Sequence, residues 1–378
     1  MKKTLLLSLL LTISVISLQA QFPVGTSTIT YTDASRTRDI DVQVYYPATS
    51  AGSNTPFATG TFPLIVLGHG FSMTGLVYTY FANAVVAEGY ILACPRTEEA
   101  LGSADHGEFG LDLAFINTKI KSEGTNNASI FYNHILGTSA IMGHSMGGGC
   151  TFLAGQNNTN IDCMISFAAN ETTPSAITAA ALCTVPNLVV SGEVDCVSDP
   201  ATNQVLMYNA VYSTCKSYIS IKDGSHCNFG DYSFWCTFGE STCMPTPPLT
   251  DAEQQDVAVD FSLLYLNWHL KGDATAQAAF VDSLSSSRLA TYQHTCPSVN
   301  VEEMNANNNF IFPNPATDLL NVSFANAAEE IYVMDVAGKI LMTIPNTFNY
   351  QQIDISDLQP GYYLIRSGRT AGRFLKVD

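Results

Sequence analysis

Several features that mark other classes of protein are missing from this sequence of 378 residues. It has no G-x-x-x-x-G-K phosphate loop and no C-x-x-C pair, so neither a P-loop nucleotide site nor a structural zinc site is expected. Basic residues are scarce: 16 Lys and Arg face 33 Asp and Glu, and the formal net charge is −17. Such a chain repels nucleic acid and anionic membrane surfaces. We therefore expect no nucleic-acid partner, no metal and no cofactor.

The sequence also lacks an apolar run long enough to span a bilayer, which takes about 18 residues or more. Its longest apolar run, Leu5 to Leu18, follows Lys2 and Lys3 and ends in Gln19-Ala20-Gln21. This pattern is typical of a secretory signal peptide, 1–20, with cleavage near Ala20. Ten cysteines in an exported chain then indicate disulfide bonds.

One segment carries the pattern G-x-S-x-G, with Ser145 at its centre. A short apolar run, 140–142, precedes it, and three glycines, 147–149, begin a helix-compatible stretch. Strand, sharp turn and helix are the setting of a nucleophile elbow, in which the turn exposes a serine hydroxyl above the sheet. The motif predicts that Ser145 is a catalytic nucleophile.

Two candidate partners for Ser145 follow it in the chain. Asp195 and His226 each come just after an apolar, strand-like run. The chain order Ser, Asp, His is that of α/β-hydrolases. A serine hydroxyl becomes a strong nucleophile when an imidazole takes its proton and a carboxylate orients that imidazole. Glu193 is an alternative acid, two residues before Asp195.

An acyl-transfer site also needs two backbone N–H groups that hold the developing oxyanion. We assign one to Met146, the residue after the nucleophile. The other is expected from Phe71, in the glycine-containing loop that follows the apolar run 62–67, and the Phe71 ring would then line the site. The alternative is a glycine turn without this role.

The order of predicted elements indicates two folded domains. In 21–297, after two exposed edge strands, strands near 63–67, 90–94, 138–142, 162–168, 187–191 and 217–222 alternate with helices near 74–88, 108–122, 145–155, 201–212 and 251–270. This alternation predicts an α/β fold with a mostly parallel sheet covered on both faces. A polar, Asn-rich linker is expected at 298–309, and short alternating strands in 310–378 predict a small all-β sandwich.

The first domain, roughly 24–297, resembles the bacterial polyester hydrolases, the cutinase-like α/β-hydrolase family that includes poly(ethylene terephthalate) hydrolases. The matching segments are 66–71, 141–151, 186–195 and 219–226. The resemblance implies a serine esterase with Ser145, Asp195 and His226 as its triad and with the oxyanion hole assigned above. The family commonly places a Trp, part of an aromatic clamp, after the strand that follows the nucleophile helix. Asn170 occupies that position here.

The tail resembles the C-terminal sorting domain of the type IX secretion system of Bacteroidetes. The segments that carry this resemblance are 312–318 and 357–363. It implies transport through the periplasm and across the outer membrane, with the secretion machinery as a partner. The protein is then expected outside the cell or on its surface, and the tail is an address with no part in catalysis.

Two cysteines adjoin the predicted triad, since Cys196 follows Asp195 and Cys227 follows His226. These two loops must lie side by side if the carboxylate contacts the imidazole, so we expect a Cys196–Cys227 disulfide, much as some polyester hydrolases link these loops. The alternative is that each has another partner. Cys183–Cys215 and Cys236–Cys243 are further candidate pairs, and four cysteines stay unassigned: Cys94, Cys150, Cys163 and Cys296.

A stretch of 24 residues separates His226 from the helix predicted to begin near Asp251. Loops of this length in compact domains are usually functional or mobile. This one carries five aromatic residues, Phe229, Tyr232, Phe234, Trp235 and Phe238. We expect it to form one wall of the substrate groove, with Trp235 in contact with substrate. The alternative is that these rings pack under the loop as a satellite core.

The sequence thus predicts a secreted, monomeric serine ester hydrolase that works through an acyl-enzyme. No cap-domain insertion separates the strands of 63–222, so an open cleft and polyester-like or other bulky carboxylic esters are expected. Three alternatives stay open: a secreted lipase or small-ester esterase, a serine peptidase of the same fold, and a catalytically silent binding protein.

Overall fold

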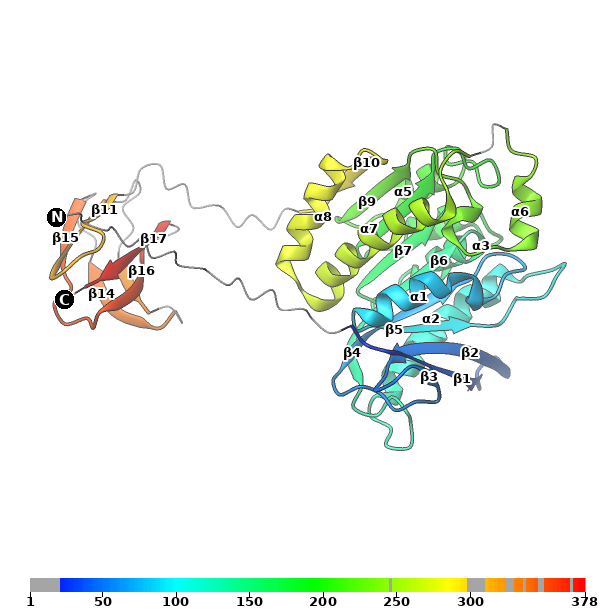
Figure 1. Cartoon of the computed structure of the whole chain (residues 1–378), viewed down its shortest axis with the longest axis horizontal. Helices are drawn as coiled ribbons and strands as arrows, with labels where there is room; N and C mark the ends of the chain where they lie inside the picture. The colour runs from blue at the N-terminus through cyan, green and yellow to red at the C-terminus, as the bar shows by residue number, and fades with distance from the viewer. Residues whose placement is uncertain are drawn as a thin grey trace, which may run out of the picture. The chain divides into compact units, whose positions relative to one another are not determined.

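The computed structural model describes residues 21–244, 247–297, 310–323, 330–335, 338–345, 350–367 and 370–377. The chain divides into two compact units, Met1–Pro297 and Ser298–Asp378, and each is described by itself (Figure 1). The expected signal peptide, 1–20, and linker, 298–309, lie outside the described residues.

A ten-stranded sheet forms the centre of the first unit, in the order β10-β9-β8-β7-β6-β4-β5-β2-β1-β3. Strands β4 to β9 run parallel, whereas β1, β2 and β10 pair antiparallel towards the two edges. β4, β5 and β7 are buried along their whole length, as continuous apolar strands must be when helices cover both faces. The bounds are β1 Val24–Asp33, β2 Arg38–Pro47, β3 Gly52–Ser53, β4 Phe62–Gly68, β5 Ile91–Pro95, β6 Ile135–His144, β7 Cys163–Phe167, β8 Asn187–Gly192, β9 Lys216–Ile221 and β10 Ala290–Thr295.

Helices cover both faces of this sheet, and each layer has its own hydrophobic core (Figure 1). One layer consists of α2 (His106–Glu123), α3 (Met146–Gly155), α4 (Ala176–Ala180) and α5 (Gln204–Ala210). The other consists of α1 (Thr79–Ala87), which follows the 3₁₀ turn η1 (Gly75–Tyr78), together with α7 (Asp251–Lys271) and α8 (Ala274–Ser286). This arrangement confirms the α/β-hydrolase fold. No helix in the described part of the chain is both long and apolar enough to cross a membrane.

The end of the first unit differs from the sequence prediction. The predicted final helix is α7, which begins with a capping box formed by Thr250 and Glu253 and ends at Gly272, whose φ of 68° suits glycine. A second helix, α8, follows it, and the chain then returns as β10 beside β9. β10 is largely exposed, so it has no apolar run that would mark it in the sequence.

Two antiparallel sheets enclose the core of the second unit, which confirms the predicted β-rich tail. The orders are β11-β12-β15 and β14-β13-β16-β17. Side chains from both sheets, such as Val322 and Val333, pack in one cluster, as in a sandwich. The bounds are β11 Phe310–Phe312, β12 Leu319–Ser323, β13 Glu330–Met334, β14 Ile340–Pro345, β15 Tyr350–Asp354, β16 Gly361–Ser367 and β17 Thr370–Lys376.

Candidate active site

Ser145 lies in the turn between β6 and α3, with φ 55° and ψ −119°. A non-glycine residue at positive φ is strained, and the surrounding packing must hold it there. Glycines allow that packing, because a Cβ on Gly143 would overlap the backbone of Gly147, and one on Gly147 would overlap the backbone of Gly68. The strand, the turn and the helix therefore approach closely, and the Ser145 side chain is left above the end of the sheet.

Asp195 and His226 meet Ser145 at the carboxyl ends of β8 and β9. His226 Nε2 lies 2.9 Å from Ser145 Oγ, and His226 Nδ1 lies 2.7 Å from Asp195 Oδ2. The carboxylate is buried, and its Oδ1 accepts from the backbone N–H groups of Val197 at 2.9 Å and Ser198 at 2.8 Å. These bonds fix the direction of the carboxylate, so that it can accept a hydrogen bond from Nδ1–H and leave Nε2 free to take the proton of Ser145.

The alternative acid, Glu193, has a different contact. Its Oε2 accepts from the backbone N–H of Asp223 at 3.1 Å, so it braces the turn after β9. The structure therefore places Asp195, and not Glu193, against the imidazole of His226.

The loop that was predicted to supply an oxyanion donor packs on the first turn of α3. Gly147 N–H donates to the His69 carbonyl oxygen at 3.1 Å, which holds the loop after β4 beside Met146. Phe71 follows in this loop, and its side chain is 44% exposed. The two predicted donors, the N–H groups of Phe71 and Met146, are thus carried by segments that touch each other.

Asn170 lies against the elbow, where the resembling family has its Trp. Its N–H donates to the Ser145 carbonyl oxygen at 3.0 Å, and its Oδ1 accepts from Ser198 Oγ at 2.9 Å. Ser198 is also one of the two backbone donors to Asp195. Asn170 therefore bridges the nucleophile and the acid loop through polar bonds, and it offers no ring to an acyl group.

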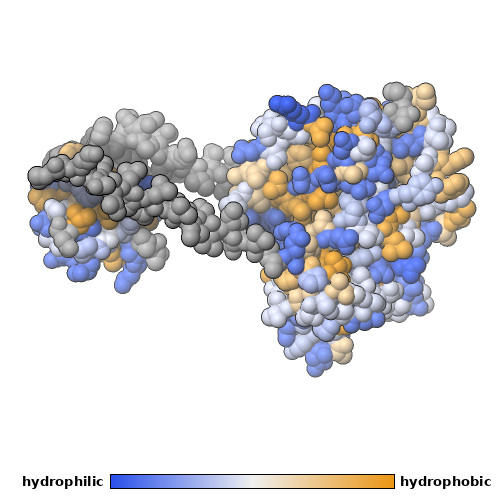
Figure 2. Space-filling model, viewed as in Figure 1, coloured by the Kyte–Doolittle hydropathy of each residue, from blue (hydrophilic) through white to orange (hydrophobic). Residues whose placement is uncertain are grey.

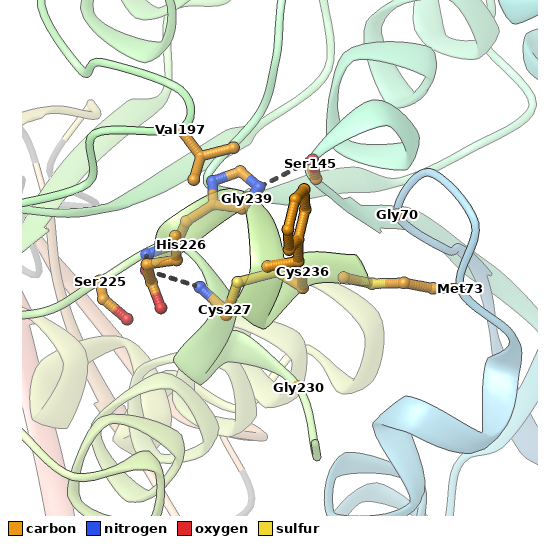
Figure 3. The surroundings of a disulfide bond; sticks show 12 residues. Gly70, Met73, Ser145, Val197, Ser225, His226, Cys227, Gly230, Cys236 and Gly239 are labelled. Carbon is orange, nitrogen blue, oxygen red and sulfur yellow. Dashed lines mark hydrogen bonds between the residues drawn. A yellow bond between two sulfur atoms is a disulfide. The ribbon is translucent and has the colours of Figure 1, made fainter. Parts of the chain in front are cut away.

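The predicted Cys196–Cys227 disulfide is wrong. Cys196 is bonded to Cys243 and Cys227 to Cys236, each with a Cα–Cα distance of 5.7 Å. The reason lies in the turns: Cys196 is in the turn capped by Asp195, and Cys227 begins the 3₁₀ turn η2 (Cys227–Phe229). Cys236 and Cys243 both belong to the segment after His226, so this segment links the acid loop to the base loop. Figure 3 shows the bond between Cys227 and Cys236 beside His226.

The two further candidate pairs, Cys183–Cys215 and Cys236–Cys243, are also wrong. Cys215 is bonded to Cys296, because the β9–β10 register pairs Lys216 with Thr295 and brings the residues just outside the pair together. The signal that was missed is β10 itself, which the sequence does not mark. Four cysteines are free and buried: Cys94, Cys150, Cys163 and Cys183.

The segment after His226 is not a plain loop, because it contains the helix α6 (Phe234–Glu240). Glu240, at the end of this helix, accepts through Oε1 from the backbone N–H groups of His226 at 2.8 Å and Cys227 at 3.3 Å. Sequence reasoning missed Glu240, since a lone Glu 14 residues after a histidine carries no recognisable signal. Together with the two disulfides, it fastens α6 to the candidate site.

The aromatic residues of this segment divide into two groups. Phe229 is buried and stacks on Phe167 with ring centroids 5.3 Å apart, as the satellite-core alternative requires. The other four are exposed instead: Tyr232 by 74%, before α6, and Phe234 by 58%, Trp235 by 45% and Phe238 by 64%, within it. The three rings of α6 contact one another, two pairs edge to face and one pair stacked. Figure 2 shows apolar side chains at the edge of the first unit that α6 occupies in Figure 1.

Both units of the chain are similar to known proteins. A family model described as PET hydrolase-like matches residues 14–233, and one described as a secretion system C-terminal sorting domain matches residues 310–375. Over 175 residues, 45% of the chain, the sequence is 22% identical to Cutinase 1 of Thermobifida cellulosilytica and to Cutinase of Thermobifida fusca (strain YX). These alignments span 63% and 54% of the two cutinases.

Proposed function

The chain belongs to the PET hydrolase-like family, and on that premise we propose that it is a secreted carboxylic ester hydrolase that works through an acyl-enzyme. One observation carries the proposal: a hydrogen-bonded sequence runs from Ser145 Oγ through the His226 ring to the buried Asp195 carboxylate. These three side chains have the relative geometry of a nucleophile, a base and an orienting acid.

In the proposed mechanism, Ser145 Oγ attacks the ester carbonyl while His226 Nε2 takes the hydroxyl proton. The imidazolium that forms is stabilised by Asp195. The N–H groups of Phe71 and Met146 hold the negative oxygen of the tetrahedral intermediate. His226 then gives its proton to the leaving alcohol, and a water molecule activated by the same imidazole releases the acid from Ser145.

We further propose that the substrates are polyester-like or other bulky carboxylic esters. The family match and the similarity to cutinases support this class. Exposed aromatic residues on segments that adjoin the site support it too: Phe71 from the loop after β4, and Trp235 from α6. In this proposal Trp235 takes over part of the contact that Asn170 cannot make.

Replacement of the nucleophile tests the reaction. We expect Ser145→Ala to lower kcat on p-nitrophenyl butyrate by several orders of magnitude with an unchanged Tm, because it removes one hydroxyl from residues that act as a unit. Ser285→Ala, on the exposed side of α8, is the control and should keep full activity. Most of the activity surviving in pure Ser145→Ala would falsify the proposal.

A substrate panel separates the proposed class from its alternatives. Release of soluble acids from polyester film supports the proposal, whereas turnover of triglycerides or short-chain esters alone indicates a lipase or a small-ester esterase. Cleavage of peptides without cleavage of esters indicates a peptidase, and a folded protein inactive on all of them indicates a binding protein.

A further inference from the structure

A buried chain of hydrogen bonds joins three parts of the candidate site without including the Ser145 hydroxyl. Gly70 N–H donates to the Tyr78 hydroxyl at 3.0 Å, and that hydroxyl lies 2.9 Å from His144 Nδ1. His144 Nε2 lies 3.0 Å from the His226 carbonyl oxygen. Tyr78 is 1% exposed and His144 is fully buried, so water does not compete for these bonds.

The direction of each bond follows from the groups involved. The His226 carbonyl oxygen can only accept, so His144 Nε2 carries a proton. Burial, helped by the neighbouring His226, holds the pKa of His144 well below its ordinary value, so the ring is neutral and Nδ1 is an acceptor. The Tyr78 hydroxyl therefore donates to Nδ1 and accepts from Gly70. Met73 Sδ, 3.4 Å from the same hydroxyl, is the weaker acceptor.

The residues in this series of hydrogen bonds adjoin the oxyanion donor, the nucleophile and the base of the proposed mechanism. Gly70 precedes Phe71, His144 precedes Ser145, and the third member is the backbone of His226 itself. The three lie on different elements: the loop after β4, the end of β6 and the start of η2. Their relative positions decide whether nucleophile, base and oxyanion donors converge on one carbonyl group.

We propose that Tyr78 and His144 are positioning residues that hold the oxyanion loop, the nucleophile elbow and the catalytic histidine in register. This inference rests on the proposed function, since it assigns a role in that reaction. A slight displacement of the Phe71 N–H or of the imidazole weakens contacts made mainly in the transition state. The effect of losing the chain therefore falls on kcat more than on KM.

Tyr78→Phe removes the central hydroxyl and keeps the ring. We expect kcat on p-nitrophenyl butyrate to fall about tenfold or more, with KM within about twofold of the native value. Tyr90→Phe is the matched control, since Tyr90 is equally buried and its hydroxyl donates to Asn267 of α7 at 2.7 Å. It should lose similar stability and keep kcat. Equal kcat values in the two folded variants overturn the proposal.

Two substitutions of His144 give an independent reading. Gln places an amide nitrogen near the position of Nε2 and keeps the bond to the His226 carbonyl, whereas Asn reaches only the position of Nδ1. We expect His144→Asn to lose more kcat than His144→Gln. Native kcat in both overturns the proposal, and this pair decides it if Tyr78→Phe does not fold.

Ser145→Ala, measured in parallel, distinguishes a failure of the proposed function from a failure of the positioning role. If Ser145→Ala stays active, the proposed function is at fault. If Ser145→Ala is inactive while Tyr78→Phe turns over at the native rate, the function stands and the positioning role of Tyr78 and His144 is refuted.

Discussion

Among single residues, two histidines make the stability of the first unit sensitive to acid. Burial lowers the pKa of His269, in α7, to about 4, and it lowers the pKa of His144 well below the usual 6.5. In the unfolded chain both rings take up protons near pH 6.5. Between pH 6.5 and 4 the unfolded state therefore binds more protons than the folded state, and the free energy of unfolding falls as the pH falls.

We expect His269→Gln to flatten this dependence. One histidine that stays neutral only in the folded state contributes a slope of up to about 1.4 kcal/mol per pH unit within the window. Urea unfolding at pH 4.5, 5.5 and 6.5 measures the slope, and above pH 7 the two proteins should differ by a constant amount. Parallel curves throughout would show that His269 is protonated in the folded protein as readily as in the unfolded one.

Among the secondary-structure elements, α6 and the residues just after it are tied to both the acid loop and the base loop. Cys227–Cys236 fastens it to the base loop, and Cys196–Cys243 fastens the residues just after it to the acid loop. Glu240 adds a hydrogen bond to the backbone N–H of His226. The backbone of His226 is thus held at its N–H by Glu240 of α6 and at its carbonyl oxygen by His144. The same helix presents three exposed aromatic rings.

Glu240→Ala should lower kcat several-fold with little change in KM, because the backbone of His226 loses an acceptor and the ring is held less firmly against Ser145. Glu240→Gln keeps an oxygen at the same place and should retain most of the activity. Steady-state kinetics on a soluble ester measure both. If the two variants lose the same activity, the charge of Glu240 matters and the hydrogen bond does not.

Trp235→Ala tests whether the exposed face of α6 contacts substrate. Since the ring is 45% exposed, its removal should cost little stability. We expect a KM raised several-fold on a bulky aromatic ester such as p-nitrophenyl benzoate and an unchanged KM on p-nitrophenyl acetate, because only the large acyl group reaches the ring. Equal losses on the two esters, with a lowered Tm, would assign the ring a structural role.

For the whole molecule, the candidate active site and the secretion signal of the tail lie in different units. The sorting domain at 310–375 identifies a secreted protein, found outside the cell or on its surface. All the residues of the candidate active site lie in the first unit, Met1–Pro297. The partnership with the type IX secretion machinery and the monomeric state stay predictions.

A chain that ends at Pro297 should keep native kcat and KM on soluble esters, since it retains the candidate site and the Cys215–Cys296 bridge. In the native host the same truncation should abolish export, because the matched sorting domain is gone. Activity measured in cell fractions and in the medium checks both expectations. A folded but inactive truncation would mean that the tail contributes to the site.

The sequence by itself determined the features that local chemistry encodes. The glycines around Ser145 predicted the nucleophile, because only residues without a side chain let the strand and the helix approach so closely at the strained turn. The continuous apolar strands predicted the parallel sheet. Asp195 and His226 could be located because the carboxyl ends of parallel strands share one edge of the sheet. The alternation of polar and apolar residues likewise predicted the strands of the tail.

Only the tertiary structure decided what depends on side-chain direction and on distant partners. The turns at Cys196 and Cys227 aim both sulfur atoms at the segment of α6, which adjacency to the triad could not reveal. The register of an exposed edge strand paired Cys215 with Cys296. Glu240 and Tyr78 became relevant because folding brings them to His226 and His144, residues 14 and 66 positions away, and no local pattern encodes such contacts.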